Sequence, residues 1–409
     1  MTIKVWTGGA EAGLLGPLGP RGSAFAYAAN GTPERAVSLT MPVRLASWDV
    51  QYGLAPIFEM NLPEGALRER LRLAFAKATG GFDDFDLLSI VGRSQIGRLR
   101  YTGVEDDLDE TVPFQSVDEI LSSRRSGDLF AYLLAQFGKF SGVSGVQPKL
   151  LVRDESAIAG PANRSSIRGA THIVKFWEPD YPELAANEYF CLRAARRCGL
   201  EVPRFQLTED GRALVIDRFD LRADGGYRGF EDLCVLNARG AADKYRGSYE
   251  SSVLKRFRDF ASGDVIAWDS ERLFTLIVLN SAIRNGDAHL KNFGVVYDDI
   301  NSTVSLAPVY DLVTTTAYIP ADAMALTLDG TTRWPDAKRL RTFGESRGVG
   351  SPAAVQTMLE RVGDALAETA AEIRVHMAER PVFAEIGDRM LQAWSAGAIE
   401  SLASVGGFT

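Results

Sequence analysis

Cysteine and histidine are scarce in this chain of 409 residues. The three cysteines are Cys191, Cys198 and Cys234, and no two of them have the CxxC spacing. The histidines, also three, lie far apart in the sequence. Because a zinc site needs clustered ligands and a disulfide scaffold needs many cysteines, the sequence argues against both and fits a reducing compartment.

Long apolar segments and an excess of positive charge are also missing. No run reaches the roughly 18–20 apolar residues that span a bilayer, and residues 1–6 lack the apolar core of a signal peptide. The net charge of −8 argues against a broad electrostatic affinity for nucleic acid. We therefore expect a globular, cytoplasmic protein with no membrane contact and two or three domains.

The predicted fold is α+β, with a β-rich first domain, a mixed second domain and a mainly helical third domain. An acidic stretch at residues 105–110 is typical of a solvated linker, and helical patterns dominate after residue 220. The domains are therefore expected at residues 1–110, 115–220 and 221–409. The order of strand, helix and strand in the second domain suits the N-lobe of a protein kinase.

Periodicity and turn residues predict the individual elements. Residues 156–170 are predicted to form a polar loop. The predicted strands are Ile3–Thr7, Ala24–Ala28, Val37–Met41, Leu150–Val152, His172–Trp177, Phe205–Leu207 and Ala213–Phe219, with a hairpin of Asn292–Tyr297 and Val304–Ala307. The predicted helices are Glu64–Lys77, Val117–Phe137, Glu183–Cys198, Ser270–Arg284, Pro352–Ala378 and Ala384–Ala403.

The most informative motif consists of Asp287, Asn292 five residues later, and Asp311 after an apolar segment. The first Asp can accept the proton of a hydroxyl nucleophile, and the Asn and the second Asp can hold Mg²⁺ against the phosphates of ATP. The predicted hairpin would bring Asp311 back beside Asn292. The alternative is ordinary turn and cap chemistry, for which Asn-Gly-Asp sequences are common.

Two further polar residues lie inside this motif. His289 either contacts phosphate or braces the loop, and Lys291 either neutralises the transferred phosphate or lies on the surface.

Lys175 lies in a β-branched strand, where an inward lysine is costly without an anionic partner. In kinase-like folds such a lysine contacts ATP phosphates and pairs with a glutamate on the next helix. Glu188 is well placed for that pairing, and Glu183 is the competing partner. The alternative is a lysine on an edge strand that points to solvent.

Two segments are candidates for nucleotide contacts. Residues 144–149 contain a glycine, which lets backbone N–H groups approach an anion, although an ordinary turn is the competing interpretation. Residues 217–219 end an apolar strand just before the helical region, where kinases grip adenine. The candidate residues are Ser144, Gly145, Val146, Gln147, Lys149, Asp217, Arg218 and Phe219.

Taken together in this order, the motifs resemble the HipA family, the serine/threonine kinase toxins of bacterial toxin–antitoxin modules. The resemblance covers nearly the whole chain, and it is specific because many strings occur in family order. Further strings that carry it are Phe58–Gly65, Leu87–Gly92, Asn187–Tyr189, Lys244–Tyr245, Gly247–Glu250 and Tyr310–Asp311.

The resemblance implies a bilobal, protein-kinase-like fold with ATP and Mg²⁺ as cofactors. It implies that Asp287 is catalytic, that Asn292 and Asp311 hold the metal, and that His289 and Tyr310 line the site. It also implies phosphate contacts from Lys175 and residues 144–149, and adenine contacts from residues 217–219.

The same resemblance implies partners. Known targets of the family include aminoacyl-tRNA synthetases, notably the glutamyl enzyme, whose phosphorylation arrests translation and growth and can produce drug-tolerant, persistent cells. The family's partner is HipB, a small helix-turn-helix antitoxin, and contact with DNA is expected only through that complex.

One departure concerns autophosphorylation. Family members often carry a modified serine at the position of Gly142, so self-inactivation here would use Ser141 or Ser144. A phosphate on either serine would repel the ATP phosphates and eject the loop. Phosphopeptide mapping tests this hypothesis, which fails if neither serine is modified.

Two other function classes compete with an active protein kinase. One is a catalytically silent corepressor that holds an antitoxin on DNA, although the complete set of catalytic residues counts against it. The other is a kinase for small molecules or lipids, because residues 286–292 also resemble the catalytic loop of phosphoinositide-type kinases.

Overall fold

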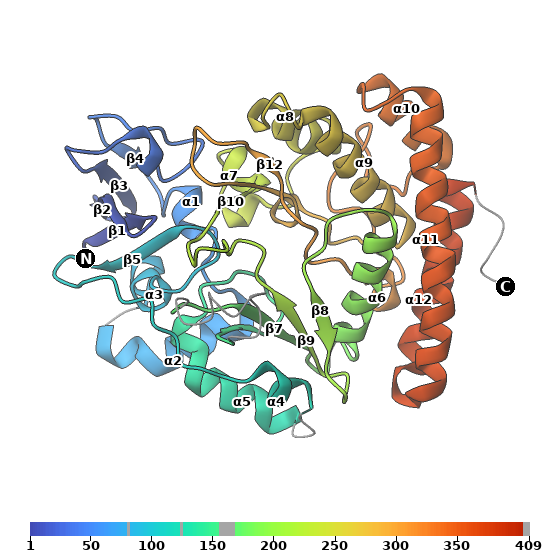
Figure 1. Cartoon of the computed structure of the whole chain (residues 1–409), viewed down its shortest axis with the longest axis horizontal. Coiled ribbons are helices and arrows are strands. Elements are labelled where there is room, and N and C mark those ends of the chain that lie inside the picture. Colours follow the sequence, from blue (N-terminus) through green and yellow to red (C-terminus); the bar gives the residue numbers. More distant parts are fainter. Residues whose placement is uncertain (80–81, 123–125, 155–167, 404–409) are drawn as a thin grey trace. The chain divides into compact units, whose positions relative to one another are not determined.

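The computed structural model describes residues 1–79, 82–122, 126–154 and 168–403 (Figure 1). The chain forms two compact units. The first consists of Met1–Glu178, Phe205–Asp243 and Val295–Val304, and the second of Pro179–Arg204, Lys244–Gly294 and Ser305–Thr409. The division into three domains stays a prediction.

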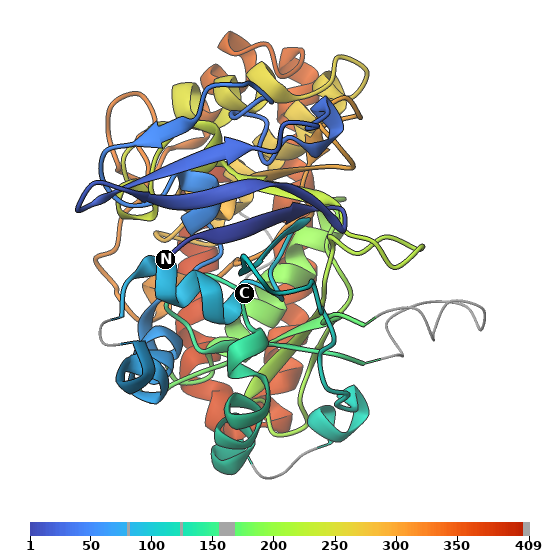
Figure 2. The same ribbon diagram turned by 90° about the vertical axis from the view of Figure 1, so that its left-hand side faces the viewer.

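A five-stranded antiparallel sheet begins the first unit, with strand order β4-β3-β2-β1-β5. Figure 2 shows its long strands side by side. In β1 the side chains alternate between buried and half-buried, so Ile3 and Val5 enter the core. The strands are β1 (Ile3–Thr7), β2 (Ala10–Leu18), β3 (Gly22–Tyr27), β4 (Trp48–Val50) and β5 (Leu99–Gly103).

The predicted strand Val37–Met41 was wrong, because this segment forms only an isolated bridge between Ser38 and Met41. The polar groups of this segment bond elsewhere: Ser38 Oγ and the Leu39 backbone N–H both donate to the Glu231 carboxylate. These groups therefore bond to a side chain nearly 200 residues away in the sequence and not to a neighbouring strand.

Short helices complete this part of the first unit. A capping box starts α3 (Asp84–Val91), where Asp83 accepts from the Asp86 backbone N–H and Asp86 accepts in return. The predicted helix Val117–Phe137 is instead two helices, and residues 123–125 between them lie outside the described ranges. The other helices here are α1 (Pro56–Glu59), α2 (Gly65–Thr79), α4 (Val117–Leu121) and α5 (Ser126–Phe137).

A second antiparallel sheet of the first unit has the order β6-β7-β9-β8. Its inner strands are almost fully buried, and Lys149 on β6 is the register partner of Lys175 on β7. Most of the polar loop predicted at residues 156–170 lies outside the described residues. The strands are β6 (Lys149–Val152), β7 (His172–Phe176), β8 (Phe205–Leu207) and β9 (Ala213–Asp217).

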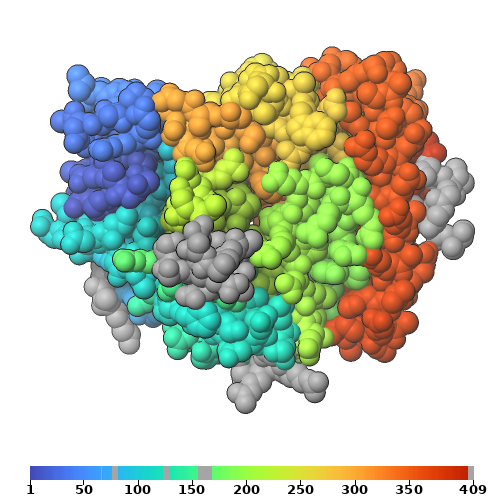
Figure 3. Space-filling model, viewed as in Figure 1, coloured from blue at the N-terminus to red at the C-terminus, as the bar shows by residue number. Residues whose placement is uncertain are grey.

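The second unit is mainly helical, as predicted for the C-terminal part of the chain. Its longest helix, α11 (Pro352–Glu379), contacts both α6 (Leu184–Arg197) and α12 (Ala384–Gly397). Together with α10 (Ala337–Ser346), α11 and α12 expose a continuous surface in Figure 3. Arg193 and Arg197 of α6 both pair with Glu372, and hydrogen bonds led by that from Arg197 lower the pKa of this carboxyl to about 2.

Most residues of the helix α9 (Ile266–Ala282) are buried in the second unit, while Trp268 near its start is exposed. It lies very close to α12, because a Cβ on Gly397 would be 1.9 Å from the Ala282 carbonyl oxygen. This mostly buried and closely packed helix leads directly into residues 283–293. No helix of the described residues has the length and hydropathy to cross a membrane.

One buried polar cluster connects distant segments of the first unit. Glu231 lies in β10 (Gly229–Asp232) and accepts hydrogen bonds from Ser38, Leu39 and the Tyr297 hydroxyl of β11 (Gly294–Tyr297). Burial raises the pKa of Glu231 to about 6, although these hydrogen bonds oppose the rise.

This pKa predicts a pH dependence of stability. A folded-state pKa raised above the unfolded value adds stability that is fully present below the unfolded pKa and is lost as the pH rises through about 6. Between pH 7 and pH 5, the wild-type chain should therefore gain about 1 kcal/mol in unfolding free energy relative to Glu231→Gln. Chemical denaturation at several pH values measures it, with the exposed Glu105→Gln as the matched control. If the unfolding free energy of the wild type relative to Glu231→Gln falls on acidification, the expectation is contradicted.

Candidate functional site

The chain turns sharply after α9 and presents Asp287. Arg284 has a positive φ of 59°, which marks the turn, and the Asn285 amide donates to the Asn280 side chain at 2.7 Å. The same Asn285 side chain accepts from the backbone N–H of Asp287 at 3.1 Å. These local bonds hold the loop, and the Asp287 carboxylate stays partly exposed.

Gly286 is required at its place in this loop. Its N–H donates to the Thr315 hydroxyl at 2.7 Å, and the backbone passes close to Asp322 and Ala323. A Cβ here would lie 2.1 Å from an Asp322 carboxylate oxygen and 2.6 Å from the Ala323 carbonyl oxygen. Only glycine allows this approach without a shift of the surrounding backbone.

Asn292 brings together the two aspartates of the motif. It ends a short 3-10 helix, Leu290–Asn292, and its Nδ2 donates to the backbone oxygens of Asp287 (3.1 Å) and Asp311 (3.3 Å). The Ala307 N–H donates to the Gly294 carbonyl oxygen, which returns the chain toward this point. The structure therefore places the three motif residues side by side in the second unit, while their roles stay predictions.

The Oδ1 atom of Asn292 is buried and has no hydrogen-bond partner among the described residues. A buried oxygen without a partner is costly, so it suits a ligand that supplies positive charge. Asp311 nearby has a left-handed φ of 51°, an uncommon conformation that often marks functional loops. The set of one amide and two carboxylates fits Mg²⁺, which prefers oxygen ligands.

His289 is buried in the same loop. Burial lowers its pKa, so the imidazole is neutral at pH 7. Its ring lies 5.1 Å from the ring of Tyr245 in a T-shaped arrangement, and its Nδ1 has no hydrogen-bond partner in the described part of the chain. A neutral imidazole can still donate a hydrogen bond, so both predicted roles of His289, phosphate contact and support of the loop, stay predictions.

Tyr245 was given no role by sequence reasoning. Its hydroxyl donates to the Asp287 carboxylate at 2.7 Å. The available signal was its place in the string that resembles the family. Tyr310 contacts the same loop, because its hydroxyl donates to the Lys291 carbonyl oxygen at 2.8 Å.

The candidate phosphate loop lies in the first unit, before β6. Gly145 has a φ of +115°, and a Cβ there would lie 2.5 Å from the Lys149 ammonium. Gln147 donates to the Phe176 carbonyl oxygen at 3.0 Å, which ties the loop to β7.

Lys149 and Lys175 are register partners, and both are only 3% exposed. Side chains of paired residues lie on the same face of a sheet, so both lysines belong to one face, where their positive charge suits an anion such as phosphate. Glu188 is fully buried in α6 of the second unit, and its pairing with Lys175 stays a prediction.

The sequence predicts that Arg218, just after β9, contacts the nucleotide, but its side chain binds other residues of the protein. The Arg218 guanidinium forms a fully buried ion pair with Asp220 and donates to the Gln95 carbonyl oxygen at 2.7 Å. Its backbone N–H also donates to the Thr171 carbonyl oxygen at 3.0 Å, so a contact of Arg218 with a nucleotide stays a prediction. Asp217 lies 3.4 Å from His172 Nε2, and Phe219 packs edge-on against Phe230.

The two candidate phosphorylation sites differ in access. Ser141 is fully buried, and its hydroxyl donates to the Phe137 carbonyl oxygen and accepts from the Leu151 N–H. Ser144 is half-buried. At Gly142 a Cβ would lie 2.7 Å from the Ser94 carbonyl oxygen, so this conformation has no room for a serine there.

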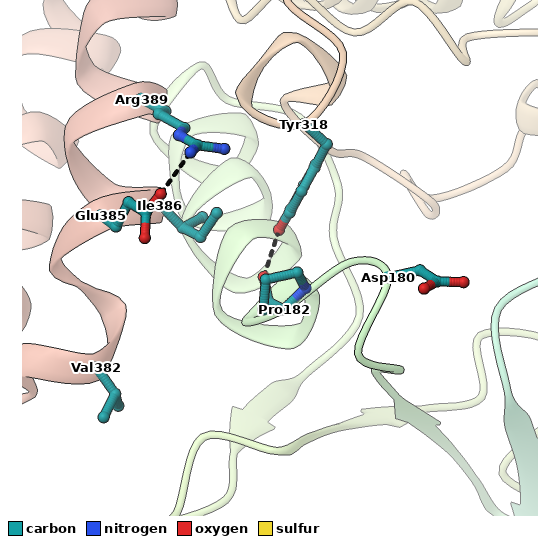
Figure 4. A pocket seen from close by; sticks show the side chains of 7 residues that line it. All are labelled: Asp180, Pro182, Tyr318, Val382, Glu385, Ile386 and Arg389. Atoms are coloured by element: carbon teal, nitrogen blue, oxygen red, sulfur yellow. Dashed lines mark hydrogen bonds and ion pairs between the residues drawn. The ribbon is translucent and has the colours of Figure 1, made fainter.

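A separate hollow of about 200 Å³ lies in the second unit (Figure 4). Within it, Arg389 pairs with Glu385, and Tyr318 donates to the Pro182 carbonyl oxygen at 3.0 Å. It contains none of the predicted site residues, and its geometry gives it no part in the chemistry described above. The hollow is lined by Asp180, Pro182, Tyr318, Val382, Glu385, Ile386 and Arg389.

Comparison with known proteins places the chain in a family. Residues 3–102 match the HipA N-terminal domain, and residues 141–372 match the HipA-like C-terminal domain. In Sinorhizobium fredii, the protein named "Putative kinase Y4mE" is 30% identical over 78% of both chains. A second protein there, "Putative kinase Y4dM", is 27% identical over 66% of this chain and 64% of its own.

A solved structure shows the same fold. The HipA chain of the Shewanella oneidensis complex of HipA, HipB and operator DNA aligns with a TM-score of 0.66 at 19% identity, covering 96% of this chain and 97% of that one. The fold is therefore the kinase-like α+β fold predicted from the sequence. The chain belongs to the HipA family.

The crowding around Gly286 predicts the effect of a single methyl group. Gly286→Ala should destabilise the chain by about 1–3 kcal/mol, the usual cost of overpacking, and should displace the Asp287 loop. Thermal unfolding measures the loss. Gly263→Ala is the matched control, because a Cβ there meets nothing within 4 Å. Equal melting temperatures for the two variants would contradict the proposed crowding.

Proposed function

We propose that this protein is an ATP-dependent serine/threonine protein kinase and the toxin of a HipBA-like toxin–antitoxin system. The observation that carries the proposal is the arrangement around Asn292, whose amide joins Asp287 and Asp311 while its buried Oδ1 has no partner in the described residues. Phosphoryl transfer depends mainly on positioning and charge neutralisation; this loop would supply the positioning and the oxygen ligands for the Mg²⁺ that neutralises the phosphate charge.

Each residue has a distinct part in this proposal. Asp287 orients the substrate hydroxyl and accepts its proton, while Asn292 and Asp311 hold Mg²⁺. Magnesium, when bound, neutralises the phosphate oxygens of ATP. Lys149 and Lys175 hold phosphate by charge, and the backbone of residues 144–147 supplies N–H donors.

The proposed partners follow from the family. The Shewanella relative was solved with HipB and operator DNA, so we propose a HipB-like helix-turn-helix antitoxin here, with DNA reached through it. The proposed substrate is a cytoplasmic protein, with an aminoacyl-tRNA synthetase as the first to test. Growth arrest and persistence would follow from its phosphorylation.

The second candidate is a corepressor without catalysis. The operator complex of the Shewanella relative favours it, since that assembly contains DNA. Retention of every predicted catalytic residue, with Asn292 bonded to the backbone of both Asp287 and Asp311, favours the kinase.

Removal of the Asp287 carboxylate tests the proposal. Transfer of radiolabelled γ-phosphate from Mg-ATP to proteins of a bacterial lysate should fall about 100-fold or more in Asp287→Ala, because a positioned general base contributes that much. Asp264→Ala is the matched control, an exposed aspartate of the same unit.

The outcomes separate the two candidates. A labelled band with the wild type and the control, and none with Asp287→Ala, supports the kinase and identifies its target by mass. Absence of transfer from all three proteins, with Mg-ATP still bound, favours the corepressor. Undiminished transfer by Asp287→Ala overturns the assignment of the base.

A further inference from the structure

The hydroxyl of Tyr245 lies where a substrate hydroxyl would have to bind. It donates to an Asp287 carboxylate oxygen at 2.7 Å, and it is the one hydrogen-bond donor that the described residues present to that carboxylate. A kinase base binds its substrate in the same way, through a hydroxyl that donates to the carboxylate at hydrogen-bond distance.

The backbone on either side of Tyr245 is anchored. The Lys244 carbonyl oxygen accepts from the Leu290 N–H at 3.0 Å, which ties this segment to the Asp287 loop itself. Two residues after Tyr245, the Gly247 carbonyl oxygen accepts from the Thr327 N–H at 3.2 Å. The backbone is therefore fixed, and the position of the hydroxyl is decided by the side-chain torsions of Tyr245.

Half of the surface of the Tyr245 side chain is exposed, which leaves solvent space beside the ring. The ring packs against the buried His289 at 5.1 Å between ring centres, and Lys244 Nζ lies 5.6 Å from the centre of the ring. Displacement of the hydroxyl breaks its hydrogen bond to Asp287, and partly exposed side chains change rotamer rapidly.

We propose that the Tyr245 hydroxyl occupies the position of the substrate hydroxyl and blocks Asp287 until a protein substrate displaces it. This inference rests on the proposed kinase function and adds a gate to that site. The gate excludes water and small alcohols, which cannot displace the phenol, and admits a hydroxyl carried on a protein that binds the surrounding surface.

The hydrolysis of Mg-ATP by water tests the gate without a known substrate. Tyr245→Phe keeps the ring beside His289 and removes the hydroxyl. Phosphate release should rise about three- to tenfold, the factor that one net hydrogen bond supplies, while the dissociation constant for Mg-ATP stays unchanged. Tyr181→Phe is the matched control, a partly exposed tyrosine of the same unit, and should behave as the wild type.

Every outcome decides between the possibilities. Faster hydrolysis confined to Tyr245→Phe supports the gate. Equal or slower hydrolysis by that variant, with an active wild type, overturns the gate and leaves the kinase in place. Hydrolysis absent from all three proteins despite Mg-ATP binding also overturns it, because removing the block released nothing. Failure of all three folded proteins to bind Mg-ATP overturns the kinase and the gate together.

Discussion

A fully buried ion pair between Arg218 and Asp220 organises the first unit. Its groups are also hydrogen-bonded: Arg218 donates to the carbonyl oxygens of Gln95 and Ala170, and Asp220 accepts from the Gly97 N–H at 2.7 Å. A buried pair of this kind contributes little net stability, but loss of either partner would leave an uncompensated charge. The pair therefore fixes where residues 95–97 lie relative to the end of β9.

Residues 94–97 also hold the segment just before the candidate phosphate loop. The Gly142 N–H donates to the Ser94 carbonyl oxygen at 2.9 Å, and the Ile96 N–H donates to the Gly142 carbonyl oxygen at 3.3 Å. Residues 94–97 belong to the part of the chain that matches the HipA N-terminal domain. The N-terminal domain is thus hydrogen-bonded to Gly142, just before residues 144–149, and to Arg218 in residues 217–219. We infer that it helps to position both proposed nucleotide-binding segments.

Sequence reasoning succeeded where information is local. The helix before Asp287, the spacing of Asp287 and Asn292, and the strand carrying Lys175 all follow from short patterns. It failed where distant residues meet: the predicted strand at residues 37–41 is absent, and Ser38 and the Leu39 N–H bond instead to Glu231, more than 190 positions away. The contact of Tyr245 with Asp287 joins residues 42 positions apart, and no periodicity encodes it.

Hydrogen bonds between neutral groups hold much of the backbone of the Asp287 loop. Asn285 and Asn292 hold its backbone through amides, and His289 beside it is neutral because it is buried. Hydrogen bonds between neutral groups do not depend on the charge of the site, so they can hold this part of the backbone when a cation or a phosphate arrives. Fixed dipoles of this kind cost no reorganisation during the reaction, which is the property that electrostatic catalysis requires.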